Sequence, residues 1–486
     1  MKNRRLNIRS NRNSGIDPLL KRSFPFRHPD QKNEYQQTKQ LQADGRFLRL
    51  QRIISEDNMK SQTTKKPHTG RYILLCLLAV LLIFGTIFSH FGGLGPGKSA
   101  DREAFAVYAK EVSDLALPEH TRIAALGEAT HGNSEFQQLK RTVFQNLAEK
   151  YGIRAFCLEG DYGGCEMVNR YIHGGEGSAE EAAAEIGFAI YRTEEMADLI
   201  RWMREYNATA AEGEDLIFYG FDMQRSDKDY ACLKEACAKA GIDTSRLDQL
   251  WDTEAESFSE TATLEEKTDA LTEIKEQFDP SDSYGIHAAD ILLQNSKIFE
   301  EYNAGRNPVG MRDQFMTDNV LWMLKQEEDR GHECIFVSAH NGHVEQLGSY
   351  DADNKVMGNL LADTIGKDAY YVIGTDFQKA TVNLPLQNGK RITHTFYSHD
   401  PLANAAKQCG YEMCWLDFSA VSENSPLYPA VHDYCWMGSL GDSYNALFMT
   451  FVPMSYRIYR SPALTYDSMI FVSNAHPTVI QEVPNQ

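Results

Sequence analysis

Ionisable side chains directly follow several short apolar runs of this sequence, at the positions where a parallel sheet would gather them. The runs and the residues behind them are 122–127 with Glu128 and His131, 153–158 with Glu159 and Asp161, 215–221 with Asp222, 333–338 with His340 and His343, and 370–375 with Asp376. In open α/β sheets the ligand crevice lies outside the carboxyl ends of the strands. One such residue alone is commonly a turn former, but recurrence at five strand ends predicts a functional rim.

These residue types suit hydrolysis by an activated water molecule. Imidazole accepts a proton readily near neutral pH, so His131 is the expected general base. A neighbouring carboxylate, either Glu128 or Glu159, would fix its tautomer and support the imidazolium that forms. A second imidazole or Arg312 would stabilise the oxyanion. The sequence contains no G-x-S-x-G motif, so a serine nucleophile of that kind is not expected.

A metal site is the alternative chemistry for the same rim. His340 and His343 are three residues apart, and with His131 and Glu159 they could supply ligands to zinc or manganese. An H-x-x-H spacing on a loop is much less specific than H-E-x-x-H on a helix. The main expectation is therefore hydrolysis without a cofactor. A metal-dependent hydrolase or peptidase and a non-catalytic ligand-binding module stay open as alternatives.

The order of apolar and amphipathic segments predicts an α/β fold with a mainly parallel sheet flanked by helices. Helical patterns at 134–150 and 193–207 alternate with the strand-like runs, and runs at 412–418 and 467–472 extend the same sheet. Residues 228–332 break this alternation, because they are charged, apolar at helical spacing and without a convincing strand. We expect an all-helical insertion there, either a packed layer or a lid over the site.

The net charge of −19 is distributed unevenly along the chain. Residues 1–71 carry 17 Lys and Arg against 6 Asp and Glu, which leaves 32 against 62 for the rest. A strongly acidic domain repels nucleic acid and anionic lipid. No nucleic-acid partner is therefore expected for the main domain, and the sequence gives no indication of an oligomeric state.

One long uncharged apolar run, residues 72–89, has the length of a transmembrane helix. At about 1.5 Å per residue it covers about 27 Å, close to a bilayer core of roughly 30 Å. About 70 residues precede it, which disfavours a cleavable signal peptide, and the absence of a polar face disfavours a buried core helix. Basic residues before the run place the N-terminus in the cytoplasm and the large domain outside. The expected order is a basic disordered tail (1–71), a single-pass bilayer anchor (72–92), a flexible linker (93–102) and a catalytic domain (103–486).

Several sequence blocks resemble the erythromycin esterase family in kind and in order, over roughly residues 105–475. GEATHG alone is fairly specific, HNGH and MRD alone are weak, and their ordered combination is strong. The blocks are GEATHG (127–132) followed by Ser134, Glu135, Phe136 and Lys140; LEGD (158–161); RTEE (192–195) with WMREYN (202–207); YGFD (219–222); MRD (311–313) with Asn319 and Trp322; and AHNGHV (339–344).

The resemblance implies hydrolysis of a small-molecule carboxylic ester or lactone, with macrolide opening as the family's founding activity. Position by position, His131 matches the family's proposed general base, and Glu128 and Glu159 match its essential carboxylates. His340 and His343 match its second pair of imidazoles. The family is regarded as working without a metal. Substrate contacts are expected from Arg312, Asp161 and Asp222.

Overall fold

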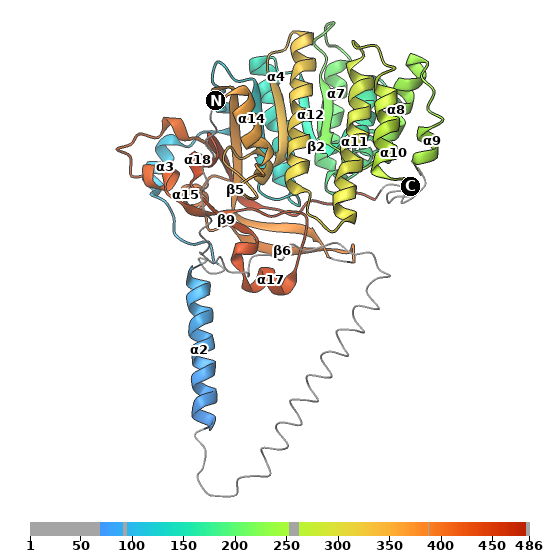
Figure 1. Ribbon diagram of the computed structural model, residues 1–486. Coiled ribbons are helices and arrows are strands. Elements are labelled where there is room, and N and C mark those ends of the chain that lie inside the picture. The colour runs from blue at the N-terminus through green and yellow to red at the C-terminus, as the bar shows by residue number, and fades with distance from the viewer. Residues whose placement is uncertain (1–68, 91–94, 252–261, 387, 483–486) are drawn as a thin grey trace, which may run out of the picture. The chain divides into compact units, whose positions relative to one another are not determined.

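A mostly parallel sheet organises the domain in the computed structural model, which describes residues 69–90, 95–251, 262–386 and 388–482 (Figure 1). Within these residues the main sheet has eight strands in the order β3-β2-β4-β1-β5-β10-β7, with β6 paired to β5. The strands are β1 (Ile123–Glu128), β2 (Ala155–Asp161), β3 (Ile217–Asp222), β4 (Ile335–His340), β5 (Tyr370–Pro385), β6 (Arg391–Tyr397), β7 (Met413–Asp417) and β10 (Ser468–Ala475). Among the described strands of this sheet, only the pairings of β7 with β10 and of β6 with β5 are antiparallel. The predicted mainly parallel α/β fold is confirmed.

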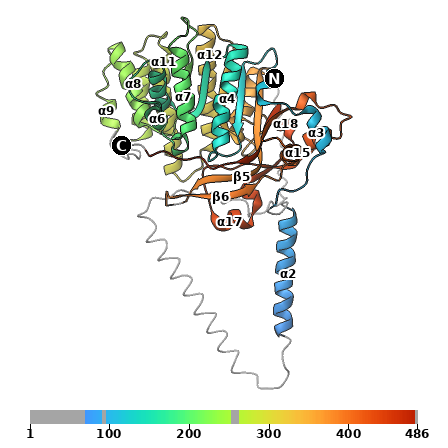
Figure 2. The same ribbon diagram turned by 180° about the vertical axis from the view of Figure 1, so that it is seen from behind.

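Helices cover both faces of this sheet. Figure 1 shows α8, α10, α11 and α12 in front of it, and Figure 2, seen from behind, shows α4 and α7 on the other face. The helices of the domain are α3 (Arg102–Tyr108), α4 (Ser134–Tyr151), α5 (Tyr162–Ile172), α6 (Ala179–Glu185), α7 (Glu194–Asn207), α8 (Asp227–Ala240), α9 (Leu247–Leu250), α10 (Leu264–Lys275), α11 (Ser283–Asn303), α12 (Val309–Arg330), α13 (Asn341–Val344), α14 (Met357–Ile365), α15 (Pro401–Cys409), α16 (Tyr428–His432), α17 (Ala446–Phe451) and α18 (Pro462–Thr465).

The core lies on both sides of the strands, which explains why their sequences are continuously apolar. Successive side chains of a strand point to opposite faces. In β1, Ile123 and Ala125 belong to one buried cluster and Ala124 and Leu126 to the other. A parallel sheet covered by helices on both faces requires this pattern.

The predicted helical insertion is a packed layer. Its described part contains α8, α10, α11 and α12, whose buried residues Leu233, Leu271, Leu292 and Met323 share one core cluster with Ile123 of β1. These helices thus cover one face of the sheet, as structural helices of α/β domains do. Residues 252–261 of the insertion lie outside the described residues.

Strand β5 is much longer than the run at 370–375 predicts. Its first half pairs with β1, and its second half continues beyond β1 and pairs with β6, from Lys379 opposite Tyr397 to Pro385 opposite Arg391. A separate two-stranded ribbon is formed by β8 (Cys435–Gly438) and β9 (Arg457–Arg460). None of the apolar runs that predict strands corresponds to β6, β8 or β9.

The predicted linker is described over residues 95–102, and part of it is hydrogen-bonded to the domain. Asn404 of α15 donates through Nδ2 to the carbonyls of Pro96 and Lys98, the latter at 2.8 Å. The backbone N–H of Ala100 donates to the carbonyl of Pro401 at 2.9 Å. These bonds satisfy backbone groups of residues 95–100.

The predicted anchor region forms helix α2 (Thr69–His90). Its described apolar side chains are exposed, from Tyr72 to Phe84. Among the residues that the structure describes, no helix is long and apolar enough to cross a membrane. The predicted anchor therefore has no support from the structure. The predicted disordered tail lies outside the described residues up to position 68.

Candidate active site

Neighbouring parallel strands bring the two histidine motifs together at the carboxyl edge of the sheet. Strand β1 pairs with β4 so that Glu128 lies opposite His340. The side chain of Asn341, the first residue of α13, lies so close to β1 that a Cβ added to Gly127 would be 2.2 Å from its Oδ1. Only glycine fits such an approach. Asn341 in turn donates through Nδ2 to the carbonyl of Thr375 at 2.8 Å, which joins β5 to the same edge.

His131 is held by a buried carboxylate that has a second cationic partner. Nδ1 of His131 contacts Oε1 of Glu128, and Nζ of Lys140 contacts Oε2 of the same residue. Lys140 and Glu128 are almost completely buried, and the side chain of His131 is 12% exposed. The carboxylate fixes the proton on Nδ1, so the neutral ring has its lone pair on Nε2. Among the described residues, no hydrogen bond occupies Nε2.

The electrostatics of this triad follow from its contacts. Burial raises the pKa of Glu128, but the charges of Lys140 and His131 outweigh this effect and lower it to about 2. Burial lowers the pKa of His131, but the charge and hydrogen bond of Glu128, with smaller contributions from Glu159 and Asp442, raise it above its ordinary value. His131 is thus a base that is stronger than free imidazole.

His340 is a neutral ring whose two nitrogens are both engaged by the backbone. The N–H of Gly342 donates to Nδ1 of His340 at 3.1 Å, so Nδ1 carries no proton. Nε2 must then carry it, and it donates to the carbonyl of Leu440 at 3.2 Å. Burial, together with the nearby charge of His131, lowers the pKa of His340 to about 3. The uncharged ring of His340 therefore packs against the ring of His131, with 5.0 Å between the ring centroids.

Arg312 of α12 connects three strand ends through its guanidinium. It donates to both carboxylate oxygens of Asp222, from Nε at 3.1 Å and from Nη2 at 2.7 Å. Nη2 also donates to Oε1 of Glu159 at 2.8 Å, and Nη1 lies 3.2 Å from Nε2 of His343. These contacts use four of its five N–H groups. One N–H of Nη1 has no partner among the described residues, and the side chain is 12% exposed.

Glu159 serves as a cross-link in this arrangement. Its Oε2 accepts from the backbone N–H of His340 at 2.8 Å, while its Oε1 accepts from Arg312. Burial raises the pKa of Glu159, but the charges of His343, Arg312 and His131 outweigh this and hold it well below its ordinary value. The structure makes no hydrogen bond between Glu159 and His131. Of the two carboxylates that the sequence offered for orienting the base, Glu128 is the one in contact.

His343 forms a second imidazole–carboxylate pair. Its Nδ1 lies 2.7 Å from Oδ1 of Asp313, which is completely buried, and its Nε2 lies 3.4 Å from Oε1 of Glu159. The other oxygen of Asp313 accepts from the backbone N–H of Met357 at 3.0 Å. Burial lowers the pKa of His343, but the charges of Glu159 and Asp313 outweigh it and raise the pKa. The ring centroid is 6.4 Å from that of His340.

Two of the predicted substrate contacts have other roles in the structure. Both oxygens of Asp161 are taken by backbone N–H groups, of Gly164 at 3.2 Å and of Arg225 at 3.0 Å, so Asp161 caps α5. Asp222 is fully buried and bound to Arg312. It can position the guanidinium, but it does not itself face solvent. Arg312 is the predicted substrate contact that the structure brings to the histidines.

Lys140 and Asp313 are site residues to which the sequence reasoning assigned no role. Both occur in the quoted motifs, but each lies on a helix rather than at a strand end. Lys140 is the seventh residue of α4, and Asp313 is on the first turns of α12. A charged residue within an otherwise apolar helix face is the signal that could have indicated both residues. Such a group is rarely buried unless it is paired with an opposite charge.

The arrangement of donor atoms leaves the metal alternative open. His340 has both ring nitrogens engaged by the backbone. The carboxylates at Nδ1 of His131 and His343 leave Nε2 as the atom with which either ring would bind a metal. Across the described residues, no group of three or more His, Cys, Asp or Glu side chains is arranged to hold a metal ion.

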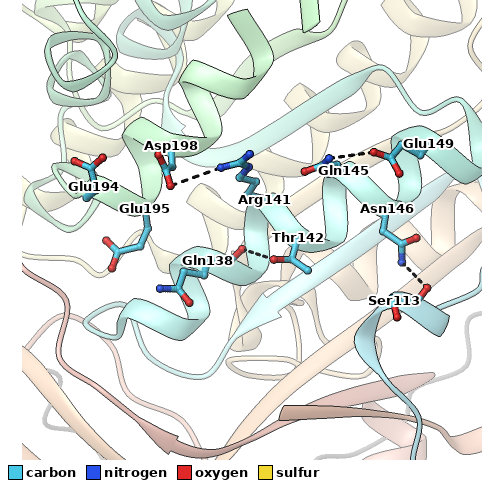
Figure 3. A pocket seen from close by; sticks show the side chains of 10 residues that line it. All are labelled: Ser113, Gln138, Arg141, Thr142, Gln145, Asn146, Glu149, Glu194, Glu195 and Asp198. Atoms are coloured by element: carbon cyan, nitrogen blue, oxygen red, sulfur yellow. Dashed lines mark hydrogen bonds and ion pairs between the residues drawn. The ribbon is translucent and has the colours of Figure 1, made fainter. Parts of the chain in front are cut away.

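A separate polar groove of about 640 Å³ lies on the outer side of α4 and α7 (Figure 3). Its side chains pair with one another, Arg141 with Asp198 at 3.6 Å and Gln145 with Glu149 at 3.0 Å. It contains none of the histidines and shares no lining residue with the site described above. The groove adds nothing to the chemistry of the histidine cluster.

The sequence of this chain is similar to those of known hydrolases. The sequence model of the erythromycin esterase family matches residues 148–475. The chain is 27% identical over 287 residues to erythromycin esterase type II of Escherichia coli, which is 51% of this chain and 67% of that protein. The chain is also 25% identical over 219 residues to YbfO of Bacillus subtilis (strain 168), and this match covers about half of that protein, 48% of its length.

Solved structures share the fold at low identity. A succinoglycan biosynthesis protein superposes with a TM-score of 0.64 at 18% identity, over 78% of this chain and 98% of that one. A Bacillus cereus protein gives 0.62 at 19% identity, over 79% and 100%. A mutant of the erythromycin esterase EreC in its open conformation gives 0.51 at 18% identity, over 75% and 93%.

Proposed function

This chain belongs to the erythromycin esterase family of hydrolases, and we propose that it hydrolyses a small-molecule carboxylic ester or lactone with a water molecule activated by His131. The observation that carries this proposal is the Lys140–Glu128–His131 triad, which leaves Nε2 of a strengthened base unoccupied at the edge of the sheet. Histidine is the side chain that most often serves as a general base in enzymes.

The proposed reaction runs in two steps. Nε2 of His131 takes a proton from water as the water oxygen attacks the carbonyl carbon, and the carbonyl π electrons move onto its oxygen. The resulting oxyanion is stabilised by the remaining N–H and the charge of Arg312. When the tetrahedral intermediate collapses, the C–O bond to the alcohol breaks and the imidazolium of His131 returns its proton to the leaving oxygen. The products are a carboxylic acid and an alcohol, or one hydroxy acid from a lactone.

The second imidazole pair positions the guanidinium of Arg312. Nδ1 of His343 lies beside Asp313, and its Nε2 accepts from Nη1 of Arg312 at 3.2 Å. The remaining N–H of Nη1 is the group that a substrate oxygen would meet. We assign Asp222 and Glu159 to positioning, because their oxygens are bonded to Arg312 and to the backbone of His340. Truncating one partner of a buried charge pair leaves the other uncompensated, which is strongly destabilising.

The test is turnover of a panel of lactones, including macrolides, and of acyl esters by the full chain in detergent, with and without a chelator. We expect at least one class to be hydrolysed and chelation to leave the rate unchanged. Loss of activity on chelation, regained with zinc or manganese, would instead support the metal-dependent alternative. Binding of ligands without turnover of any of them would support a non-catalytic binding module.

We also propose, from the sequence, that residues 72–92 anchor the chain in a bilayer with the domain outside and the basic tail in the cytoplasm. What supports this is the length and uncharged character of the run at 72–89, together with the basic residues that precede it. The proposed chemistry does not depend on it, because every residue of the site lies beyond residue 127.

A further inference from the structure

The segment that follows β8 lies beside the histidine loop. The N–H of Leu440 donates to the carbonyl of Ala129 at 2.8 Å, and Leu440 forms a parallel bridge with Thr130. Because the two segments run parallel, the chain continues in the same direction from Leu440 to Asp442 as from Thr130 to His131. Since the carbonyl of Leu440 also accepts the proton of His340, this segment is one wall of the site.

Arg391, the first residue of β6, fixes the position of Asp442. Its Nη2 donates to Oδ1 of Asp442 at 2.8 Å and to the carbonyl of Asn383 at 3.0 Å. Its Nε donates to Oδ1 of Asn383, also at 3.0 Å. The N–H of Asn383 in turn donates to the carbonyl of Gly132 at 3.0 Å. The ion pair is thus tied to the residue that follows His131, and its side chains are 18% and 33% exposed.

The other charges around His131 have partners of opposite sign. Glu128 is matched by Lys140, Glu159 and Asp222 share Arg312, and His340 is neutral. Asp442 nevertheless contributes to raising the pKa of His131 although it is paired with Arg391. Of the two partners, Asp442 is the more exposed, with 33% of its side chain accessible against 18% for Arg391. The surroundings add to its negative charge, since residues 72–486 carry 62 acidic against 32 basic residues.

We propose that Asp442, positioned by Arg391, makes the approach to His131 negative and selects neutral or cationic esters against anionic ones. The inference rests on the proposed function and narrows its substrate class. A charged group acts on a charged substrate at a distance by Coulomb's law, without touching it. Asp442 is thus a specificity-determining residue and not a catalytic one.

The test compares three matched nitrophenyl esters whose acyl chains end in a trimethylammonium, a methyl or a carboxylate group. Asp442→Asn should raise the ratio of kcat/KM for the anionic ester to that for the cationic ester, by on the order of 3- to 10-fold. Arg391→Gln should lower the same ratio, because it leaves Asp442 uncompensated. Asp442→Glu should keep the wild-type ratio. If the ion pair were purely structural, Asp442→Asn and Arg391→Gln would shift this ratio in the same direction. That result would overturn the proposal.

A second measurement does not require turnover. Bromoacetate and bromoacetamide alkylate imidazole and differ in charge, and mass spectrometry quantifies the adduct at His131 in the full chain. Asp442→Asn should raise the ratio of bromoacetate to bromoacetamide adducts. The control is Asp363→Asn on α14, where Asp363 forms an exposed ion pair with Lys355, and this variant should leave the ratio unchanged. This result would hold even if no ester were hydrolysed. An unchanged ratio, or a His131 that neither reagent reaches, would contradict the inference.

Discussion

At the scale of single residues, Glu128 has two partners that define what His131 can do. One oxygen contacts the imidazole and the other contacts Lys140, so the carboxylate stays ionised in a buried place. The residue types of this triad are readable in the sequence. Their pairing is not, because Glu128 and Glu159 both follow strands and only the register of β1 and the position of α4 decide which of them reaches the ring.

A pH profile tests this pairing. A general base works in its deprotonated form, so kcat/KM should rise with pH through the pKa of His131, with a midpoint above the ordinary value of about 6.5. Glu128→Gln removes the largest influence that raises this pKa. The midpoint should therefore move to lower pH, and the plateau should fall by about 10²-fold or more because the tautomer is no longer fixed.

The control for this profile is Glu149→Gln, on the outer face of α4. If Glu128→Gln does not fold because Lys140 is left unpaired, Glu128→Gln combined with Lys140→Met removes both charges of the pair and gives the same comparison. A profile whose midpoint is the same in the wild type and the variant would show that Glu128 does not tune the base.

At the scale of elements, the strands and helices around the site follow from periodicity, and the segment after β8 does not. The runs at 122–127, 153–158 and 333–338 match β1, β2 and β4 to within a few residues. The second half of β5 and the segment after β8 form walls of the site. The first alternates the buried residues Ala380, Val382 and Leu384 with partly exposed ones, which is the period of a half-buried strand and could have been read from the sequence. The second is placed by a contact distant in sequence, its bridge to Thr130, and has no such pattern.

The wall made by β5 can be tested with two glycines close to His131. A Cβ added to Gly132 would lie 2.2 Å from the carbonyl oxygen of Asn383, whereas a Cβ added to Gly441 would meet nothing within 4 Å. Gly132→Ala should therefore displace the loop that carries His131 and lower kcat by at least about 10-fold, since small misplacements of a base are costly. Gly441→Ala should retain wild-type kinetics. Equal kinetics of the two variants would show that this contact does not position the base.

At the scale of the whole molecule, the sequence separates a basic tail, an apolar run and an acidic domain. Charge and hydropathy predict such divisions because they are sums over many residues. They do not predict details such as the hydrogen bonds that Asn404 and Pro401 form with residues 95–100, a stretch that is rich in glycine.

The proposed topology predicts a result in intact cells. Protease added from outside should digest the domain and leave the tail before residue 72 protected, because the bilayer shields only the cytoplasmic side. Immunodetection of tags at the two termini measures this. A protected C-terminal domain would contradict the orientation, and a mature N-terminus near residue 100 would show that the run is cleaved rather than retained.

The role of His131 as the base that activates water is tested most directly by the kcat of His131→Ala on an ester that the wild type hydrolyses. The matched control is His332→Ala, which lies before β4 at the opposite edge of the sheet. Loss of a positioned general base costs about 10²–10⁴-fold in rate. We expect a fall in kcat of at least about 10²-fold in a variant that still folds, because Lys140 keeps Glu128 paired, and an unchanged kcat in the control. Wild-type turnover by a folded His131→Ala variant would contradict the assignment of His131 as the base.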